Sequence, residues 1–110
     1  MAESPLPPLP DQLFVLDRAH GTGEFLDMLL TLCTFGINVS LLLVERGVEG
    51  ITLEHRGIPV VRFREMGLRA LMVEVGAPEE AGIDLPDGVT MVDQEQIRAL
   101  YRQVPRILHP

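Results

Sequence analysis

Short, mostly apolar runs limit this chain to a small set of folds. The run Leu13-Phe14-Val15-Leu16 is wholly apolar, and a short apolar run bounded by turn residues is typical of a strand that is buried on both faces. Further runs of this kind occupy residues 38–44, 70–75 and 89–92. Segments of helical character lie between them. Strands that alternate with helices predict right-handed βαβ units and a mostly parallel β-sheet covered by helices, which is the α/β class.

Capping residues predict where two of the helices begin or end. Gly36 favours a left-handed cap after a helix over residues 24–35. Asp93 is followed three residues later by Gln96, which predicts a capping box at the start of the last helix. Residues 104–108 then predict a final strand at an edge of the sheet, where a proline is tolerated.

Glycine and proline interrupt the middle of the chain, where no long element is expected. The residues that break it are Gly47, Gly50, Gly57, Pro59 and Gly67. We expect a short helix after the second strand, then an irregular link, then a short helix over residues 61–68. Pro78 and Gly82 indicate the start and the end of a further short helix.

The chain length suits one domain, because single domains usually have about 100–150 residues and this chain has 110. The first residues are rich in proline, which fixes a backbone angle and removes a hydrogen-bond donor. Residues 1–11 are therefore expected to form a proline-rich flexible tail. Residues 12–110 are expected to form a single α/β domain.

The charge balance argues against two classes of partner. The chain has 16 acidic and nine basic residues, a net charge of −7. Nucleic acids and anionic membranes both attract clustered positive charge, so we expect no direct nucleic-acid partner and no membrane partner. No apolar stretch approaches the roughly 18 residues of a membrane-spanning helix, and the first residues lack a signal-peptide pattern. The predicted location is the cytoplasm.

The predicted helix over residues 24–35 is apolar around most of its circumference. Its polar residues fall within a sector of about 80°. A helix of this kind needs cover on two sides, and a small domain has few elements to supply the second cover. We therefore predict an oligomer interface on this helix. The interface residues are Phe25, Met28, Leu29, Leu32 and Phe35. The alternative is cover from the tail or from residues 61–68 of the same chain.

Few side chains are candidates for chemistry. The single cysteine, Cys33, lies among leucines near a helix end, which favours an inert buried thiol over a reactive one. His20, Gly21 and Thr22 follow the first strand and form a candidate pocket or a tight turn. Glu74, near the end of the third strand, is either part of that pocket or a carboxylate exposed at the rim. Neither metal binding nor a cofactor is expected, because the histidines lack ligand spacing.

Two stretches of the chain resemble a known family. They are Arg18-Ala19-His20-Gly21-Thr22-Gly23-Glu24-Phe25-Leu26-Asp27-Met28-Leu29-Leu30 and Val44-Glu45-Arg46-Gly47-Val48. They resemble the DsrE/DsrF/TusC group of sulfur-relay proteins, and TusC and DsrF most closely. The resemblance extends over most of residues 13–48 and 70–108. It implies a compact parallel α/β subunit that assembles with other sulfur-relay subunits or with copies of itself.

The resemblance also implies a function. Complexes of this group pass persulfide sulfur between cysteines, toward 2-thiouridine in tRNA or in sulfur oxidation. In the carrier subunits the acceptor cysteine follows the third strand, and Glu74 stands at that position here. The implied role is a non-catalytic, TusC-like subunit that is not an enzyme. Two alternatives stay open: a homo-oligomeric small-anion binder or enzyme that uses His20 and Glu74, and a sulfur carrier that uses Cys33.

Overall fold

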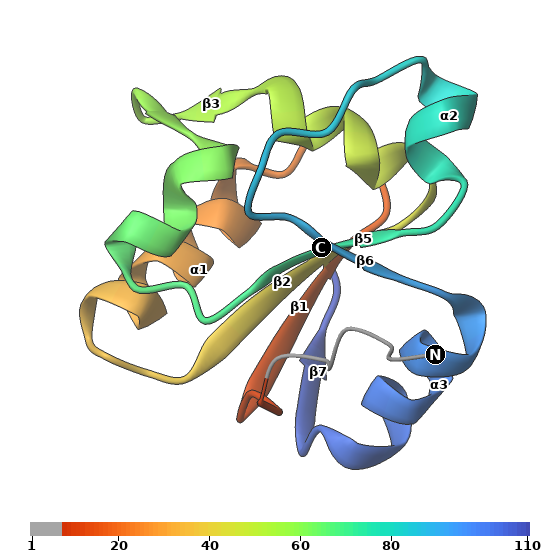
Figure 1. Cartoon of the computed structure of the whole chain (residues 1–110). Helices are drawn as coiled ribbons and strands as arrows, with labels where there is room; N and C mark the ends of the chain where they lie inside the picture. Colours follow the sequence, from red (N-terminus) through yellow and green to blue (C-terminus); the bar gives the residue numbers. More distant parts are fainter. Residues whose placement is uncertain (1–7) are drawn as a thin grey trace.

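Five parallel strands form the central sheet of this chain. In the computed structural model, which describes residues 8–110, they lie in the order β6-β5-β2-β1-β7 (Figure 1). The strands are β1 (Gln12–Leu16), β2 (Val39–Leu43), β5 (Leu71–Glu74), β6 (Thr90–Val92) and β7 (Arg106–Leu108). Every neighbouring pair in this sheet is parallel. The predicted α/β class is confirmed, and the last strand is at an edge as expected.

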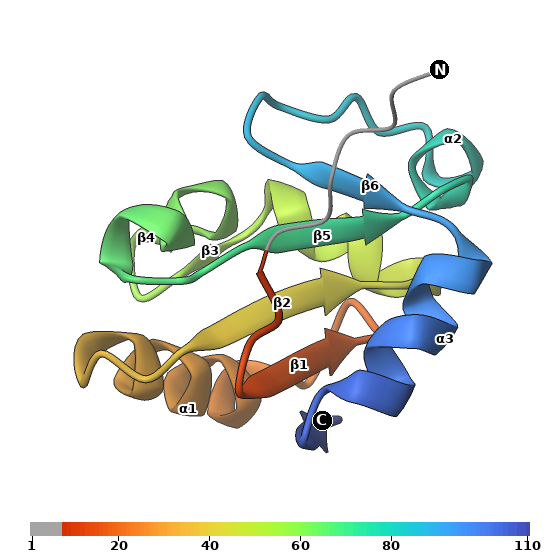
Figure 2. The same ribbon diagram turned by 60° about the horizontal axis from the view of Figure 1, so that its bottom comes forward.

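Both faces of the sheet are buried, as the apolar runs predicted. Phe14 and Leu16 point to one face, and Leu13 and Val15 point to the other; all four are at most 1% exposed. The first face packs against four helical elements: α1 (Gly23–Thr34), η1 (Glu45–Thr52), η2 (Val60–Met66) and α2 (Ala77–Ala81). The second face packs against α3 (Gln94–Gln103), as Figure 2 shows.

The predicted boundaries of α1, α2 and α3 agree with the structure to within about one residue, and the short helix expected over residues 61–68 is the 3-10 helix η2, which ends at Met66. Gly36 has a φ of +75°, which is the left-handed conformation expected after α1. Asp93 and Gln96 form both hydrogen bonds of the capping box at the start of α3, each 2.8 Å long. Gly82 ends α2 in the left-handed conformation. Among residues 8–110, no helix has the length and apolar character needed to cross a bilayer.

The expected tail is only partly within the described structure, because residues 1–7 lie outside the described residues. Pro10 is buried. The backbone N–H groups of Asp11 and Gln12 both donate to the Asn38 carbonyl, at 2.9 and 3.2 Å. These bonds attach the start of β1 and the residue before it to Asn38, the residue just before β2.

The expected irregular link is instead a two-stranded antiparallel hairpin, and this prediction was wrong. Strands β3 (Glu54–His55) and β4 (Ile58–Pro59) pair across a two-residue turn. The turn residues Arg56 and Gly57 have positive φ angles of 53° and 79°. Two-residue hairpin turns with two positive φ angles normally begin with Asn, Asp or Gly. An arginine in that place gave no hairpin signal in the sequence.

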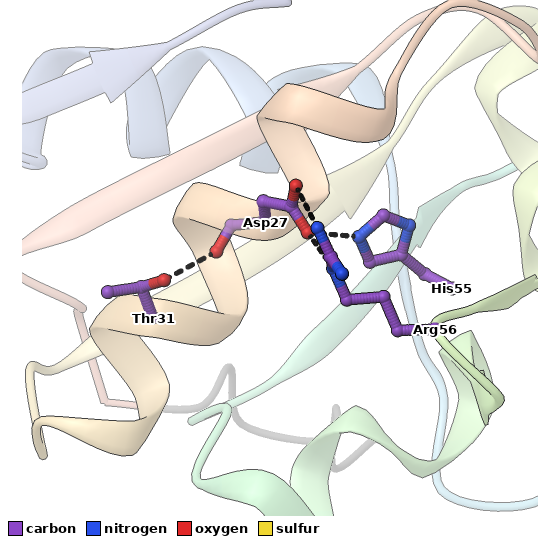
Figure 3. A network of polar contacts seen from close by, with 4 residues as sticks. All are labelled: Asp27, Thr31, His55 and Arg56. Atoms are coloured by element: carbon purple, nitrogen blue, oxygen red, sulfur yellow. Dashed lines mark hydrogen bonds and ion pairs between the residues drawn. The ribbon is translucent and has the colours of Figure 1, made fainter.

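A network of ion pairs fastens this hairpin to α1 (Figure 3). Arg56 donates from Nε and from a terminal nitrogen to the two oxygens of Asp27, at 2.5 and 3.0 Å. His55 Nε2 lies 2.7 Å from Asp27 Oδ1. Hydrogen bonds from Arg56 first, and then from His55, hold the pKa of the Asp27 carboxyl well below its usual range. The hairpin is thereby held against the middle of α1.

Replacing Asp27 with Asn is expected to lower the free energy of unfolding at neutral pH, because the charge that holds Arg56 and His55 is lost. The lowered folded-state pKa means that this stabilisation is complete above the unfolded pKa of about 4. It is lost as the pH falls through the folded-state pKa. The difference between the two proteins should therefore narrow below about pH 4.

Urea unfolding at neutral and acidic pH, followed by circular dichroism, measures this difference. Glu54→Gln on the same hairpin is the control, since Glu54 makes no ion pair within the described part of the chain. Equal unfolding free energies for wild type and Asp27→Asn at neutral pH would contradict the ion-pair account.

Candidate functional site

The carboxyl ends of β2 and β5 open into a cavity of about 650 Å³. This is the edge at which parallel α/β sheets place their ligand sites. The lining combines charged and polar side chains with a small apolar surface: Glu45, Arg46, Glu49, Glu74, Val75, Gly76, Ala77, Glu80, Ala81 and Gln94. Four of the five charged residues are glutamates, so the cavity is acidic. We call it the Glu74 cavity.

Glu74 is half-buried and is held from two sides. Its Oε1 accepts a hydrogen bond of 3.0 Å from the backbone N–H of Glu45, and its Oε2 accepts one from the side-chain amide of Gln94. The Glu45 backbone has a φ of +51°, which is unusual for a residue with a side chain. Glu74 therefore joins the end of β5 to the turn after β2 and to the start of α3.

The field of these carboxylates extends to α3. Tyr101, on that helix, has a raised pKa, first because of partial burial and then because of the negative charges of Glu74, Asp17 and Glu45. A phenolate beside three carboxylates is disfavoured, because like charges repel. Negative potential therefore dominates the side of the carboxyl edge that faces α3.

A close backbone contact sets the position of η1, which carries Arg46 and Glu49. A Cβ atom on Gly47 would lie 1.8 Å from the Leu16 carbonyl oxygen at the end of β1. The same carbonyl accepts a 3.0 Å hydrogen bond from the Val44 N–H. Only glycine allows η1 to pass so close to the end of β1.

His20 lines a second, separate cavity of about 480 Å³. Its other lining residues are Asp17, Arg18, Ala19 and Arg46. His20 and Glu74, which the sequence analysis grouped in one candidate pocket, therefore line different cavities, and Arg46 is the residue shared by both. We call this second space the His20 cavity.

The sequence analysis missed the two arginines of the His20 cavity. Arg18 Nε donates to Asp17 Oδ1 at 2.9 Å, and Arg46 Nε donates to Glu49 at 2.8 Å. The sequence does contain a signal that the two arginines lie near each other. Each of them is the second or third residue after one of two neighbouring parallel strands. Carboxyl ends of adjacent parallel strands meet at the same sheet edge.

The loop between β1 and α1 bends at residues 19–21. Gly21 has a φ of +71°. Thr22 is buried and immediately precedes α1, and its carbonyl accepts the first helical bond, from the Leu26 N–H at 2.9 Å. The Thr22 side chain makes no capping hydrogen bond. Gly21 and Thr22 thus shape the backbone beside His20.

Cys33 lies on the buried side of α1 and is 4% exposed. Burial raises the pKa of its thiol to about 11. A thiol with that pKa is almost entirely protonated at neutral pH, and the thiolate is the reactive form. Cys33 is therefore placed as a small apolar core residue.

The structure divides the five predicted interface residues of α1 between the core and the surface. Phe25 and Leu29 pack into the chain's own core, and the Phe25 ring lies 4.8 Å from that of Phe14. Leu32 is half-buried. Met28 and Phe35 are 50% and 77% exposed. The exposed part of the predicted surface is therefore Met28 and Phe35, with Leu32 at its border.

The comparisons with known proteins identify the fold. No protein-family model matches the chain, and no curated protein matches it. Among solved structures, the ychN protein from E. coli superimposes with a TM-score of 0.65 over 90% of this chain and 98% of that one. This chain has the DsrE-like fold. The sequence identity is 13%, so the likeness concerns the fold alone.

The DsrE-like fold places the Glu74 cavity at the end of the third strand of the main sheet, which is where the resemblance located the acceptor cysteine of the carriers. Within residues 8–110, no three His, Cys, Asp or Glu side chains are grouped so that they could hold a metal ion. The ionisable side chains that line the two cavities are carboxylates, two guanidinium groups and one imidazole.

Replacing Gly47 with Ala is expected to destabilise the fold, because the new Cβ overlaps the Leu16 carbonyl and only a backbone shift can relieve the overlap. Overpacking of this kind costs about 1–3 kcal/mol or more. Gly23→Ala is the matched control: no atom lies within 4 Å of its Cβ position, and alanine favours a helix over glycine by up to about 1 kcal/mol. Urea unfolding compares the two, and equal stabilities would contradict the close-contact account of η1.

Proposed function

We propose that this chain is a cytoplasmic, non-catalytic, TusC-like subunit of a sulfur-relay complex. Two things support the proposal: the DsrE-like fold and the sequence resemblance to sulfur-relay proteins. In this role the chain holds or orients partner subunits while sulfur passes between their cysteines. It carries no sulfur itself.

The hydrogen-bonded carboxylate of Glu74 is the observation that most strongly supports the proposal. A persulfide carrier needs an accessible thiol that ionises readily. At the end of β5 this chain has a carboxylate instead, and both of its oxygens accept hydrogen bonds within the chain. The position has thus become part of the framework that joins β5, η1 and α3. A residue that joins three elements in this way suits a supporting subunit rather than a subunit that carries sulfur.

The single cysteine of the sequence supports the same conclusion. Cys33 is buried in α1, and its raised pKa of about 11 keeps the thiol protonated. Attack by the persulfide of a partner would require both exposure and ionisation of this group. The proposal therefore assigns persulfide chemistry to the partner subunits.

The exposed side of α1 is the proposed contact with those partners, either other sulfur-relay subunits or a second copy of this chain. Met28 and Leu32 are four residues apart and lie on one face of α1, and Phe35 directly follows its last residue. Phe35 is 77% exposed, although burying such a side chain contributes about 1.5–3 kcal/mol. An interface on this face would recover that free energy.

Cys33 is expected to acquire no sulfur during relay. Wild type and Cys33→Ala are each incubated with a cysteine desulfurase, free cysteine and an upstream carrier, and their intact masses are measured. We expect no added sulfur atom in either protein, because the thiol is buried and protonated. Glu74→Cys serves as the comparison that places a thiol at the end of β5. A sulfur adduct on wild type that is absent from Cys33→Ala would instead identify Cys33 as a carrier.

Replacing Phe35 with Glu is expected to weaken association by about tenfold or more, because a charge would enter an apolar interface. Native mass spectrometry measures the assembly of the chain alone and with candidate relay subunits. Met91→Glu is the control, since Met91 is an exposed apolar residue of the edge strand β6. A wild-type protein that is monomeric in both conditions would refute the α1 interface, as would equal effects of the two substitutions.

A further inference from the structure

We propose that the His20 cavity binds a tetrahedral oxyanion of the phosphate type through the guanidinium groups of Arg18 and Arg46. This inference is independent of the proposed sulfur-relay role, because it concerns a different cavity and different residues. The cavity has a volume of about 480 Å³ and lies where the loop after β1 meets the start of η1.

The charges of the His20 cavity differ from those of its neighbour. Its lining includes two arginines and one histidine against a single carboxylate, that of Asp17. The Glu74 cavity has four carboxylates and shares only Arg46. Although the whole chain carries a net charge of −7, two of its nine arginines line this one cavity, Arg18 paired with Asp17 and Arg46 paired with Glu49. An anion would therefore meet more positive charge in the His20 cavity than in the Glu74 cavity.

Both guanidinium groups retain free donors. A guanidinium has five N–H donors. Among residues 8–110, Arg18 donates only from Nε, toward Asp17, and so keeps four of the five. Arg46 uses Nε and one terminal N–H, toward Glu49, and so keeps three. The partner carboxylates orient the two side chains without consuming their capacity to bind a ligand. A preoriented guanidinium loses little entropy when it binds an anion.

The arrangement favours a tetrahedral anion over a planar one. Arg18 follows β1 and Arg46 belongs to η1, so the two groups reach the cavity from different elements. A phosphate-type group offers oxygens in several directions, and arginine binds two of them at once. The imidazole of His20 supplies one further polar nitrogen. The volume exceeds that of a single phosphate, so a small organic group esterified to the phosphate also fits.

Isothermal titration at low ionic strength tests the site, with inorganic phosphate and glycerol 3-phosphate as probes and chloride as the non-tetrahedral comparison. We expect saturable binding of one phosphate group per chain. Removing a charged donor to phosphate should weaken binding about 10- to 100-fold in Arg46→Gln. Equal affinity for the two probes would indicate a site for the free anion, and tighter binding of the ester would indicate a phosphomonoester site.

Arg62→Gln is a closely matched control. Arg62 also lies in a short 3-10 helix and donates to a glutamate three residues later, at 2.8 Å, as Arg46 does. Arg62 lines neither of the two cavities. Its substitution should leave the affinity unchanged. Absence of saturable binding by wild type would overturn the proposal, as would equal losses in Arg46→Gln and Arg62→Gln or equal heats with chloride.

Discussion

Parallel pairing between β1 and β2, in register from Gln12 and Val39 to Leu16 and Leu43, brings the ends of these two strands to the same edge of the sheet. The Leu16 carbonyl accepts the Val44 N–H, and η1 then passes so close to that carbonyl that only Gly47 fits. This contact places Arg46 between the two cavities. Both faces of these strands are buried, so a shift of one residue would exchange the side chains that pack against α1 with those that pack against α3.

Glu74 has a structural task at the carboxyl edge of the sheet. Its carboxylate accepts hydrogen bonds from the turn after β2 and from the first residue of α3. The two bonds connect elements that cover opposite faces of the sheet. A cysteine at this position would not supply two strong hydrogen-bond acceptors, because its side chain has a single, weakly accepting sulfur atom. The same carboxylate thus fastens the carboxyl edge of the sheet to elements on both of its faces.

Much of the fold could be predicted from the sequence, and less of the site. The apolar runs and the Asp93–Gln96 capping box predicted the main strands and α3, because burial and capping are local signals. The β3–β4 hairpin was missed, because Arg56 has a positive φ without the usual residue type. His20 and Glu74 both follow strands of the main sheet at its carboxyl edge, but they line different cavities. Strand β2 lies between β1 and β5 and separates the two strand ends. That separation follows from strand order, which is a long-range property.

We propose that this chain supports sulfur transfer without carrying sulfur. The rate at which sulfur passes from an upstream persulfide carrier to the next acceptor in a reconstituted relay complex, measured with and without this chain, tests this role. We expect that leaving the chain out slows transfer at least about tenfold, and that Cys33→Ala restores the rate as fully as wild type. An unchanged rate in its absence would contradict the supporting role.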